Sequence, residues 1–381
     1  MGDRYLSMPR AACQHCEQQI EFPEELAGTA VDCPSCGVKT QLPASGPPKI
    51  KIPAFHSQRA WARDARSSGV TELANALIEN IEKVLVGKRE QIQLALVTFL
   101  SEGHLLLEDV PGVAKTMLAR AIAQSVDCPF KRIQCTPDLL PNDITGASIY
   151  NPKTTQFEFR PGPLFAQVVL ADEINRATPR AQSALLEAMS ERQVSADGQV
   201  YPLAAPFFLI ATQNPIDHEG TFPLPEAQLD RFLMRIALGY PKPNEELAML
   251  QRGQLRHPID ALKPVASAQT IIAAQGLVRE VTVDAKVADY LLRLVAATRE
   301  HDAIRLGASP RASLALFRAA QALAAVQGYD FVLPDDLKQI LIPVLAHRIL
   351  LRPESRLRKM TVPEVLQDIM KRTPAPLLEP N

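Results

Sequence analysis

Apolar residues follow two different spacings along the chain, and both are present from residue 71 onward. Short apolar runs of strand length alternate there with apolar residues at helical spacing. The expected strands are residues 105–108, 131–135, 168–172, 207–212 and 233–238. Alternation of strands with helices is typical of an α/β fold, in which helices cover both faces of a mainly parallel sheet.

Helical spacing also predicts where the sheet-containing part ends. Thr71 is expected to cap a first helix, and a second helix is expected over residues 88–103, where Gly103 ends it. After Pro243 the pattern is almost entirely helical. The expected helices there are residues 245–256, 284–301, 313–327 and 334–351. An all-helical domain is therefore expected to follow the α/β domain.

The chain before residue 70 lacks this periodicity. Residues 1–42 carry two cysteine pairs, and residues 43–53 contain prolines that exclude a regular helix and predict a linker. Arg59, Arg63 and Arg66 predict a short basic helix, which we interpret as a solvated face rather than a docking surface for an acidic partner. The expected parts are a small module at 1–42, the linker and short helix at 43–69, the α/β domain at 70–242 and the helical domain at 243–381.

Composition and charge narrow the class of protein. Hydrophobic residues make up 46% of the 381 residues and charged residues 22%, which is enough apolar surface for a core. The formal net charge is −1, so no overall charge favours nucleic acid or a membrane surface. No apolar run approaches the ~18 residues that span a bilayer, and the N-terminus lacks the apolar segment of a secretory signal. We expect a cytoplasmic protein without a membrane span.

Four cysteines form two CxxC pairs, Cys13 with Cys16 and Cys33 with Cys36. Each pair can supply two thiolates to one tetrahedral Zn²⁺, and the spacing is typical of a zinc-ribbon-like module. A bound metal would stabilise a segment that is too short to bury a core. Redox dithiols and an iron site are the alternatives, and neither has supporting sequence context. His15, between the first two ligands, is interpreted as a solvent-facing bystander.

The partner of this module is expected to be a protein. Residues 1–46 contain three basic and six acidic side chains, and a four-cysteine zinc site adds further negative charge. Binding to nucleic-acid phosphates requires the opposite sign of charge. The remaining two cysteines, Cys128 and Cys135, lie in apolar sequence and are expected in the core.

Residues 105–116 combine an apolar run, a loop and Lys115-Thr116 at the start of an expected helix. A P-loop has this arrangement: backbone N–H groups bind phosphate oxygens, the lysine neutralises their charge and the Thr116 hydroxyl binds Mg²⁺. Asp109 and Ala114 stand where the GxxxxGK[ST] pattern has glycine, so this segment alone does not distinguish a P-loop from a chance loop. The residues expected to contact the nucleotide are Pro111, Gly112, Val113, Ala114, Lys115, Thr116 and Met117.

A second segment makes nucleotide hydrolysis the favoured interpretation. Residues 168–173 form an apolar run that ends in Asp172 and Glu173, which is the pattern of a Walker B strand. Asp172 is expected to hold Mg²⁺ through water, and Glu173 is expected to orient and deprotonate the attacking water. An ordinary buried strand would not explain the Lys-Thr loop that precedes it.

These two motifs and three later stretches together resemble the MoxR group of AAA+ ATPases. The matching residues are 106–116, 171–177, 208–215, 219–232 and 307–312. The resemblance covers residues 70 to about 375, in order. It implies ATP and Mg²⁺ as ligands, with ATP between the α/β domain and a helical lid domain, and with its base near Val86 and Gly87.

The resemblance also implies roles for three single residues. Asn214 corresponds to sensor 1, with its amide between the Walker B acids and the γ-phosphate; a turn-forming asparagine before Pro215 is the alternative. Arg231 corresponds to an arginine finger that acts on a neighbouring subunit, and a surface salt bridge with Asp230 is the alternative. Arg311 corresponds to the sensor 2 arginine of the lid, and an ordinary arginine at a helix start is the alternative.

Two further segments resemble insertions of this branch. Residues 146–163 resemble its helix-2 insertion, and residues 192–202 resemble the hairpin before sensor 1, with Asp197-Gly198 as a suitable turn. In related proteins such elements project toward the pore or toward a partner.

The resemblance implies a ring, expected to be a hexamer, that uses ATP to remodel client proteins or assist their maturation. It suggests a chaperone-like role, with partners that carry von Willebrand factor A domains. A nucleic-acid-dependent motor is one alternative, and the acidic N-terminal module and the near-neutral net charge argue against it. A nucleotide-switched scaffold is another, and the complete set of catalytic residues argues against it. That set is Lys115, Asp172, Glu173, Asn214 and Arg231.

Overall fold

The computed structural model describes residues 10–12, 16, 19–21, 30–41, 65–214, 221–247 and 258–376. The chain divides into two compact units, Met1–Trp61 and Ala62–Asn381. None of the helices in the described part of the chain is both long enough and apolar enough to cross a membrane.

The N-terminal unit contains two small antiparallel hairpins. Strand β1 (Arg10–Ala12) pairs with β2 (Gln19–Glu21), and β3 (Ala30–Asp32) pairs with β4 (Lys39–Gln41). In sequence, one CxxC pair lies between the two strands of each hairpin. Isolated two-stranded hairpins are at best marginally stable in water, so this unit requires stabilisation beyond its strand pairing.

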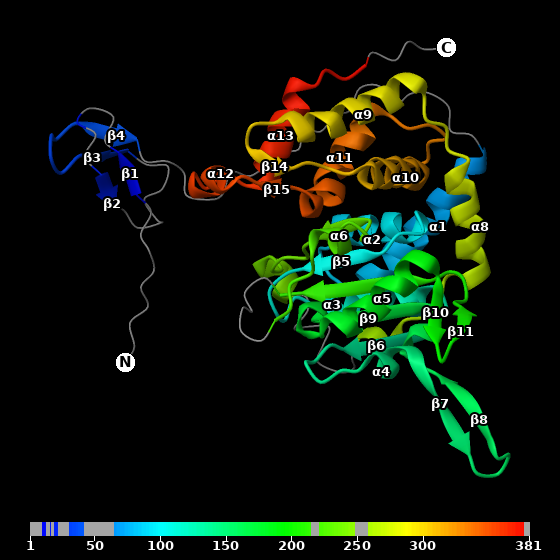
Figure 1. Ribbon diagram of the computed structural model, residues 1–381. Helices are drawn as coiled ribbons and strands as arrows, with labels where there is room; N and C mark the ends of the chain where they lie inside the picture. Colours follow the sequence, from blue (N-terminus) through cyan, green and yellow to red (C-terminus); the bar gives the residue numbers. More distant parts are fainter. Residues whose placement is uncertain are drawn as a thin grey trace. The chain divides into compact units, whose positions relative to one another are not determined.

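Five parallel strands form the central sheet of the second unit (Figure 1). Their order is β13 (Met234–Ile236), β5 (Leu105–Glu108), β12 (Phe208–Gln213), β9 (Val168–Asp172) and β6 (Phe130–Gln134). The prediction of a mainly parallel sheet is confirmed, and all five expected strands are present. Strand β6 lies one residue earlier than expected, β12 lies one residue later, and β13 is shorter at both ends.

Helices cover both faces of this sheet. Successive residues of a strand point to opposite faces, so Leu105 and Leu107 lie in one buried cluster and Leu106 lies in the other. The first cluster includes residues of α1 (Ala65–Glu82), α2 (Arg89–Leu100) and α3 (Lys115–Ser125). The second includes residues of α4 (Pro141–Thr145) and α5 (Pro179–Glu191). Burial on both faces explains why the strands are continuous apolar runs rather than alternating ones.

Two antiparallel hairpins extend from the α/β part. Strands β7 (Gly146–Asn151) and β8 (Gln156–Pro161) form the longer one, which projects away from the sheet (Figure 1). Strands β10 (Gln193–Ala196) and β11 (Gln199–Pro202) form the other. Its turn is the expected Asp197-Gly198 pair, and both residues have left-handed backbone conformations.

The C-terminal part is mostly helical, as predicted, and packs on α1 and α2 (Figure 1). Its helices are α8 (Ala268–Arg279), α9 (Ala285–Glu300), α10 (Pro310–Gln327), α11 (Pro334–Leu345), α12 (Pro353–Leu357) and α13 (Val362–Arg372). Strands β14 (Ile304–Leu306) and β15 (Leu350–Leu351) pair between them. The remaining short elements are α6 (Glu226–Leu229) and the 3₁₀ turns Pro163–Phe165, Ile174–Arg176, Pro258–Ala261 and Ala346–Arg348.

Several predicted helix boundaries are wrong. Thr71 is not a cap, because α1 begins at Ala65 and the Thr71 hydroxyl donates a hydrogen bond to the Ala325 carbonyl of α10 at 2.9 Å. Helix α10 begins before the expected residue, because Ser309 caps it and Pro310 fits its first turn.

The expected helix at 334–351 is also too long. Helix α11 ends at Leu345, and residues 346–351 form a 3₁₀ turn and β15. Helices α8, α12 and α13 were not predicted. Of the expected short basic helix, Arg59 and Arg63 lie outside the described residues, and Arg66 belongs to α1. Of the expected helix at 245–256, only residues 245–247 are described, and they are helical.

Candidate active site

The loop between β5 and α3 has the shape that the P-loop prediction requires. Gly112 and Ala114 both adopt left-handed backbone, with φ of 83° and 63°. Glycine reaches this region without strain, whereas alanine reaches it at a cost, because its Cβ crowds the backbone. Within the described chain, no side chain caps the start of α3. The N-terminal turn of this helix therefore faces the loop in the way that suits a bound phosphate.

Asp109, which replaces the first glycine of the pattern, anchors this loop. Its carboxylate accepts hydrogen bonds from the backbone N–H groups of Val110 at 2.8 Å and Gly239 at 2.6 Å. The Lys115 ammonium donates to the Asp109 carbonyl at 2.6 Å, so the lysine lies across the loop. Asp109, in place of glycine, therefore connects the P-loop to Gly239 in the segment that follows β13.

The turn at Val86 and Gly87, which was expected near the base, reaches the same segment. Gly87 has φ of 73°, and a Cβ on it would collide with the Glu245 side chain. The adjacent Lys88 ammonium donates to the carbonyls of Gly239 and Tyr240. Asp109 binds the N–H of Gly239, so the structure brings Val86 and Gly87 close to the start of the P-loop.

Asp172 and Glu173 lie at the same edge of the sheet, where β9 ends. One Asp172 oxygen accepts a hydrogen bond from the Thr212 hydroxyl at 2.6 Å, and the other accepts from Nε of Arg132 at 3.0 Å. The Thr212 hydroxyl also accepts from the Glu173 N–H at 2.8 Å. A single hydroxyl therefore connects both acids, and Glu173, with φ of 58°, leaves the extended backbone of the strand and pairs with Arg176 at 3.1 Å.

Asn214 completes this edge. It is buried and follows β12, which lies between β5 and β9. Gln213 is in register with Glu108, so Asn214 leaves the sheet between the P-loop and the two acids. The structure therefore brings together the residues predicted to bind and hydrolyse nucleotide. Sequence reasoning missed Thr212 and Arg132, since only the strand order reveals that their side chains meet Asp172.

Arg231 and Arg311 lie at the opposite edge. They line one cavity of about 320 Å³ together with Gly103 and His104, which precede β5, whereas the P-loop follows the end of that strand. The Arg231 guanidinium donates to the Leu186 carbonyl at 2.7 Å and to the Ser190 hydroxyl at 2.6 Å. The structure does not bring either arginine to the P-loop of its own chain.

The suggested salt bridge between Arg231 and Asp230 is absent. The Asp230 carboxylate instead binds the Arg348 guanidinium at 2.9 Å and accepts a hydrogen bond from the Ser309 hydroxyl at 3.0 Å. No acidic side chain of the described residues forms an ion pair with Arg231 or Arg311. Arg311 is the second residue of α10, so it does stand at a helix start.

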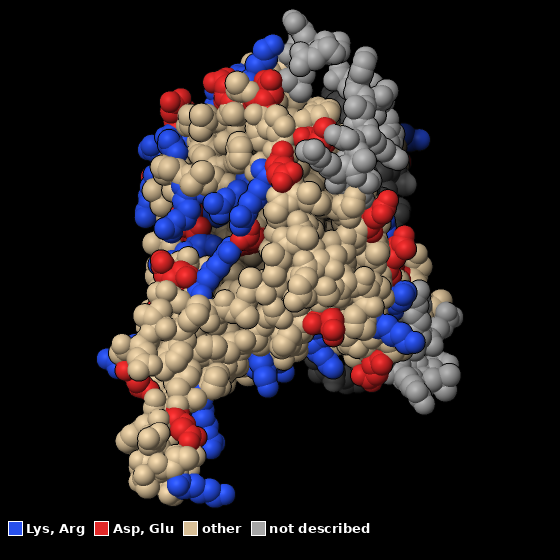
Figure 2. All heavy atoms as spheres, turned by 90° about the vertical axis from the view of Figure 1, so that its right-hand side faces the viewer, with Lys and Arg blue, Asp and Glu red and all other residues tan. Residues whose placement is uncertain are grey.

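Positive charge dominates this cavity. Arg192, Arg231, Arg311, Arg318 and Arg348 line it, against the three carboxylates of Glu102, Glu191 and Asp230. Burial lowers the pKa of His104 to about 4, so this residue adds no charge at neutral pH. Burial also lowers the pKa of Arg348, to about 10, and Asp230 opposes that shift, so Arg348 stays charged. On the side of the molecule that carries α8 and the β10–β11 hairpin, Lys and Arg gather in one region (Figure 2).

Three of the four predicted zinc ligands lie together in the N-terminal unit. The sulfur atoms of Cys16, Cys33 and Cys36 lie within 4.8 Å of one another, and those of Cys16 and Cys33 are 3.7 Å apart. Sulfurs about 2.3 Å from a tetrahedral zinc would lie roughly 3.8 Å from each other. Cys13 and His15 lie outside the described residues.

The other two cysteines behave as core residues. Cys128 and Cys135 are buried in the α/β part, as expected. Burial raises the pKa of the Cys128 thiol to about 11 and that of Cys135 to about 12, so both stay protonated at neutral pH.

Comparison with known proteins identifies the family. Residues 104–234 match the ATPase family associated with various cellular activities (AAA), and residues 296–369 match the AAA lid domain. A Bacillus subtilis protein of uncharacterised function, YeaC, is 49% identical over 305 residues, which are 80% of this chain and 95% of that protein. Chaperone MoxR1 of Mycobacterium tuberculosis is 42% identical over 305 residues, which are 78% of this chain and 80% of that protein. The chain belongs to the MoxR family of AAA+ ATPases.

A solved structure agrees with this membership of the MoxR family. A Cytophaga hutchinsonii protein, to which ATPase activity has been ascribed, superposes with a TM-score of 0.77 at 37% identity. The match covers 82% of this chain and 97% of that protein. The predicted α/β fold with a helical lid domain is confirmed, and the chain is an ATPase that uses ATP with Mg²⁺.

Proposed function

We propose that this MoxR-type ATPase assembles into a ring in which two subunits complete each active site. The observation that carries the proposal is the separation of its charged groups. Lys115, Asp172 and Glu173 lie at one edge of the sheet, and Arg231 and Arg311 lie at the other. Arginines that cannot reach their own P-loop can stabilise the transition-state charge of ATP in a neighbouring subunit.

Each residue at the P-loop edge has a proposed role in hydrolysis. Lys115 neutralises phosphate charge, Glu173 orients and deprotonates water, and Asn214 binds between the acids and the γ-phosphate. Thr116 and Asp172 would hold Mg²⁺, which when bound neutralises charge on the phosphates. Their oxygens suit this hard cation. Arg132 contacts one Asp172 oxygen, so a cation at that oxygen requires the Arg132 side chain to move.

The nucleotide itself would contact three segments. The proposed phosphate-binding residues are Pro111, Gly112, Val113, Ala114, Lys115, Thr116 and Met117, and Val86 and Gly87 are proposed to lie near the base. The contacts of Asp109 and Lys88 with Gly239 support this arrangement, because they hold the P-loop and the Val86-Gly87 turn to one segment.

The work done with ATP is proposed to be remodelling or maturation of client proteins in the cytoplasm. A relative with 42% identity is named a chaperone, which supports a chaperone-like role. The β7–β8 hairpin also supports it, because Tyr150 and Phe157 are 49% and 74% exposed on a projecting element. Exposed aromatic side chains are typical of protein contact surfaces. A hexamer and clients with von Willebrand factor A domains remain our proposals for the assembly and its partners.

Assembly is tested by the rate of ATP hydrolysis per subunit as a function of protein concentration. We expect the rate to rise and then level off, because an isolated subunit lacks the arginines of its neighbour. Steady-state rates should be measured beside the mass distribution from analytical ultracentrifugation at the same concentrations. A rate per subunit that stays constant while the oligomeric state changes would contradict shared active sites.

The N-terminal unit is proposed to bind one structural zinc ion through Cys13, Cys16, Cys33 and Cys36 and to dock a protein. The spacing of the three described sulfur atoms supports a tetrahedral site. Two-stranded hairpins are at best marginally stable in water, so ligation would supply most of their stability.

Zinc content gives a direct test. Elemental analysis of the purified protein is expected to find one zinc per chain, and Cys33→Ser is expected to lose most of it, because a serine hydroxyl is a poor zinc ligand. Cys128→Ala is the matched control. It is expected to keep its zinc, since Cys128 is buried in the α/β part with a raised thiol pKa. Equal zinc in wild type and Cys33→Ser would exclude the proposed site.

A further inference from the structure

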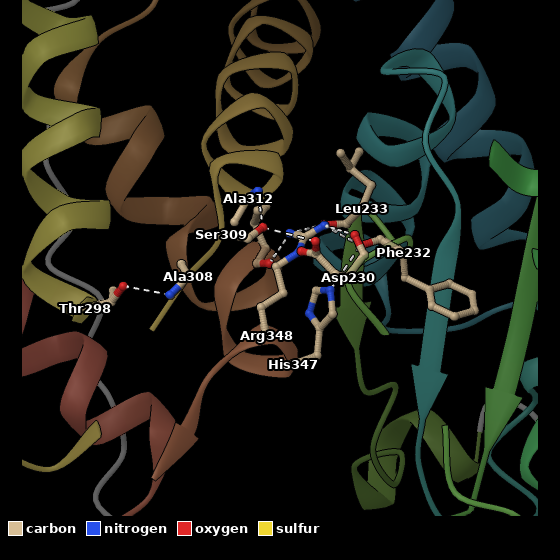
Figure 3. A network of polar contacts seen from close by, with 10 residues as sticks. Asp230, Phe232, Leu233, Thr298, Ala308, Ser309, Ala312, His347 and Arg348 are labelled. Atoms are coloured by element: carbon tan, nitrogen blue, oxygen red, sulfur yellow. Dashed lines mark hydrogen bonds and ion pairs between the residues drawn. The ribbon is translucent and has the colours of Figure 1, made fainter. Parts of the chain in front are cut away.

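The loop that carries Arg231 is held by the lid domain through Arg348. The Arg348 side chain is 3% exposed, and its Nε donates to the Asp230 carboxylate at 2.9 Å (Figure 3). One terminal nitrogen, Nη2, donates to the carbonyls of Asp230 and Phe232. The other, Nη1, donates to the carbonyls of Leu233 and Val344. All five N–H groups of Arg348 are therefore used, and three of the accepting carbonyls surround Arg231.

A second lid residue binds the other oxygen of the same carboxylate. The Ser309 hydroxyl donates to Asp230 at 3.0 Å, and its oxygen accepts from the Ala312 N–H as the cap of α10 (Figure 3). Asp230 is next to Arg231 in sequence, and Ser309 is two residues before Arg311. One partly buried carboxylate thus connects the backbone beside the first arginine to the backbone beside the second.

His347 adds an uncharged contact to this group. Its Nε2 lies 3.0 Å from the Phe232 carbonyl, which can only accept, so Nε2 carries the hydrogen. Burial and the neighbouring Arg348 hold the pKa of His347 well below its usual value, so the ring is neutral. The charged groups that act on Arg348 are Asp230 and Arg311, and Asp230 opposes the effect of burial on the Arg348 pKa.

We propose that Asp230, Ser309 and Arg348 form a clamp that positions Arg231 and Arg311 as one unit for the ATP of the neighbouring subunit. The inference rests on the proposed function, in which both arginines act across the subunit interface. These three are positioning residues, since none of them lies at the P-loop.

The chemistry of the clamp explains why arginine is required at position 348. Its planar guanidinium presents five donors in a fixed arrangement, whereas a lysine ammonium presents three from one point. Arg348→Lys keeps the charge beside Asp230 but cannot reach all of the carbonyls around Arg231. A misplacement of about 1 Å can lower a rate by roughly 100-fold. We expect Arg348→Lys to lower kcat by about 10- to 100-fold while ATP affinity stays within about twofold.

Mixing of subunits separates positioning in the neighbour from simple loss of stability. A Glu173→Gln subunit hydrolyses its own ATP only slowly but has an intact clamp and both arginines. An Arg348→Lys subunit has an intact P-loop but presents its arginines poorly. Mixed rings are expected to regain several-fold of the rate that either variant has alone, and Arg231→Ala mixed with the same partner is expected to regain activity in the same way.

Ser309→Ala is a second test of the clamp, for use if Arg348→Lys folds poorly. This variant removes the hydrogen bond to Asp230, and we expect it to lower kcat less than Arg348→Lys does. Ser309→Thr keeps the hydroxyl and is expected to restore kcat. Arg293→Lys is the matched control, because Arg293 pairs with Asp289 on the exposed surface of α9, and it is expected to leave the rate unchanged.

The outcomes distinguish the clamp from the proposed function on which it rests. If Arg231→Ala regains activity in mixed rings and both clamp variants do not, the clamp proposal is overturned while shared active sites stand. If Arg231→Ala keeps the wild-type rate when it is alone, the proposed function fails and the clamp fails with it. Recovery by both kinds of variant supports the clamp.

Discussion

Arg231→Ala is expected to lower kcat for ATP hydrolysis by about 10³- to 10⁵-fold, the range known for removal of an arginine finger. One guanidinium nitrogen, Nη1, donates to both the Leu186 carbonyl and the Ser190 hydroxyl near the end of α5. The other nitrogens of Arg231, which lines the cavity, can therefore contact a phosphate. ATP affinity should change little, because the P-loop lies at the other edge of the sheet. Single-turnover hydrolysis and the Kd of a fluorescent nucleotide measure the two effects separately.

Arg231→Lys is expected to lower kcat nearly as much as Arg231→Ala, since one ammonium cannot keep both contacts and also reach a phosphate. Arg293→Ala provides the control for loss of an exposed arginine. A wild-type kcat in Arg231→Ala, in protein shown to be assembled, would mean that the subunits are self-contained and would contradict the assignment of Arg231.

Glu173→Gln is expected to bind ATP and to hydrolyse it about 10²- to 10⁴-fold more slowly than wild type, since loss of a general base has effects of this size. Glutamine can still donate to or orient a water molecule but cannot accept its proton. The backbone at this position should stay in place, because the Thr212 hydroxyl binds the Glu173 N–H rather than its side chain. The measurement is the amount of unhydrolysed ATP that remains on the protein after a single turnover of wild type.

Glu300→Gln is the matched control, since Glu300 is exposed at the end of α9 in the lid domain. It should hydrolyse ATP at the wild-type rate. Hydrolysis by Glu173→Gln at that same rate would show that another group activates the water, and the Walker B assignment would have to be abandoned.

The sequence was sufficient to predict those parts of the candidate site that each come from one continuous segment. Lys115 and Thr116 follow a strand and a loop, and Asp172 and Glu173 end a strand, so apolar runs and their polar ends located them. The four cysteines proposed as zinc ligands were identified from their spacing alone. These signals are local because each motif is built from backbone that is continuous in the chain.

The contacts of Arg132, Asp230 and Arg348 could not be predicted in this way. Arg132 meets Asp172 only because β6 lies beside β9, and Arg348 meets Asp230 across 118 residues of chain. Neither pair has a spacing that a sequence pattern would reveal. The suggested salt bridge between Arg231 and Asp230 is wrong for the same reason. The two residues are adjacent in sequence, but Arg348, far away in sequence, binds the Asp230 carboxylate.

Helix ends were the other source of error. The predicted helix at 334–351 is too long because residues 346–351 are mainly apolar and were assigned to it. In the structure, Leu350 and Leu351 pair with β14 instead. Thr71 resembled a cap because threonine suits that position, yet its hydroxyl finds the Ala325 carbonyl of α10 instead. In both cases tertiary contacts outweighed local preference.

Ala114 has a consequence for the nucleotide site before any nucleotide arrives. A glycine there would populate left-handed and right-handed backbone about equally, so an unliganded loop would sample many shapes. Alanine narrows that sampling toward right-handed backbone, and its left-handed conformation here carries a local cost of about 1–2 kcal/mol. This cost exceeds the roughly 0.4–1 kcal/mol that narrower sampling can return, so the contacts that hold the loop, such as those of Asp109, have to offset it.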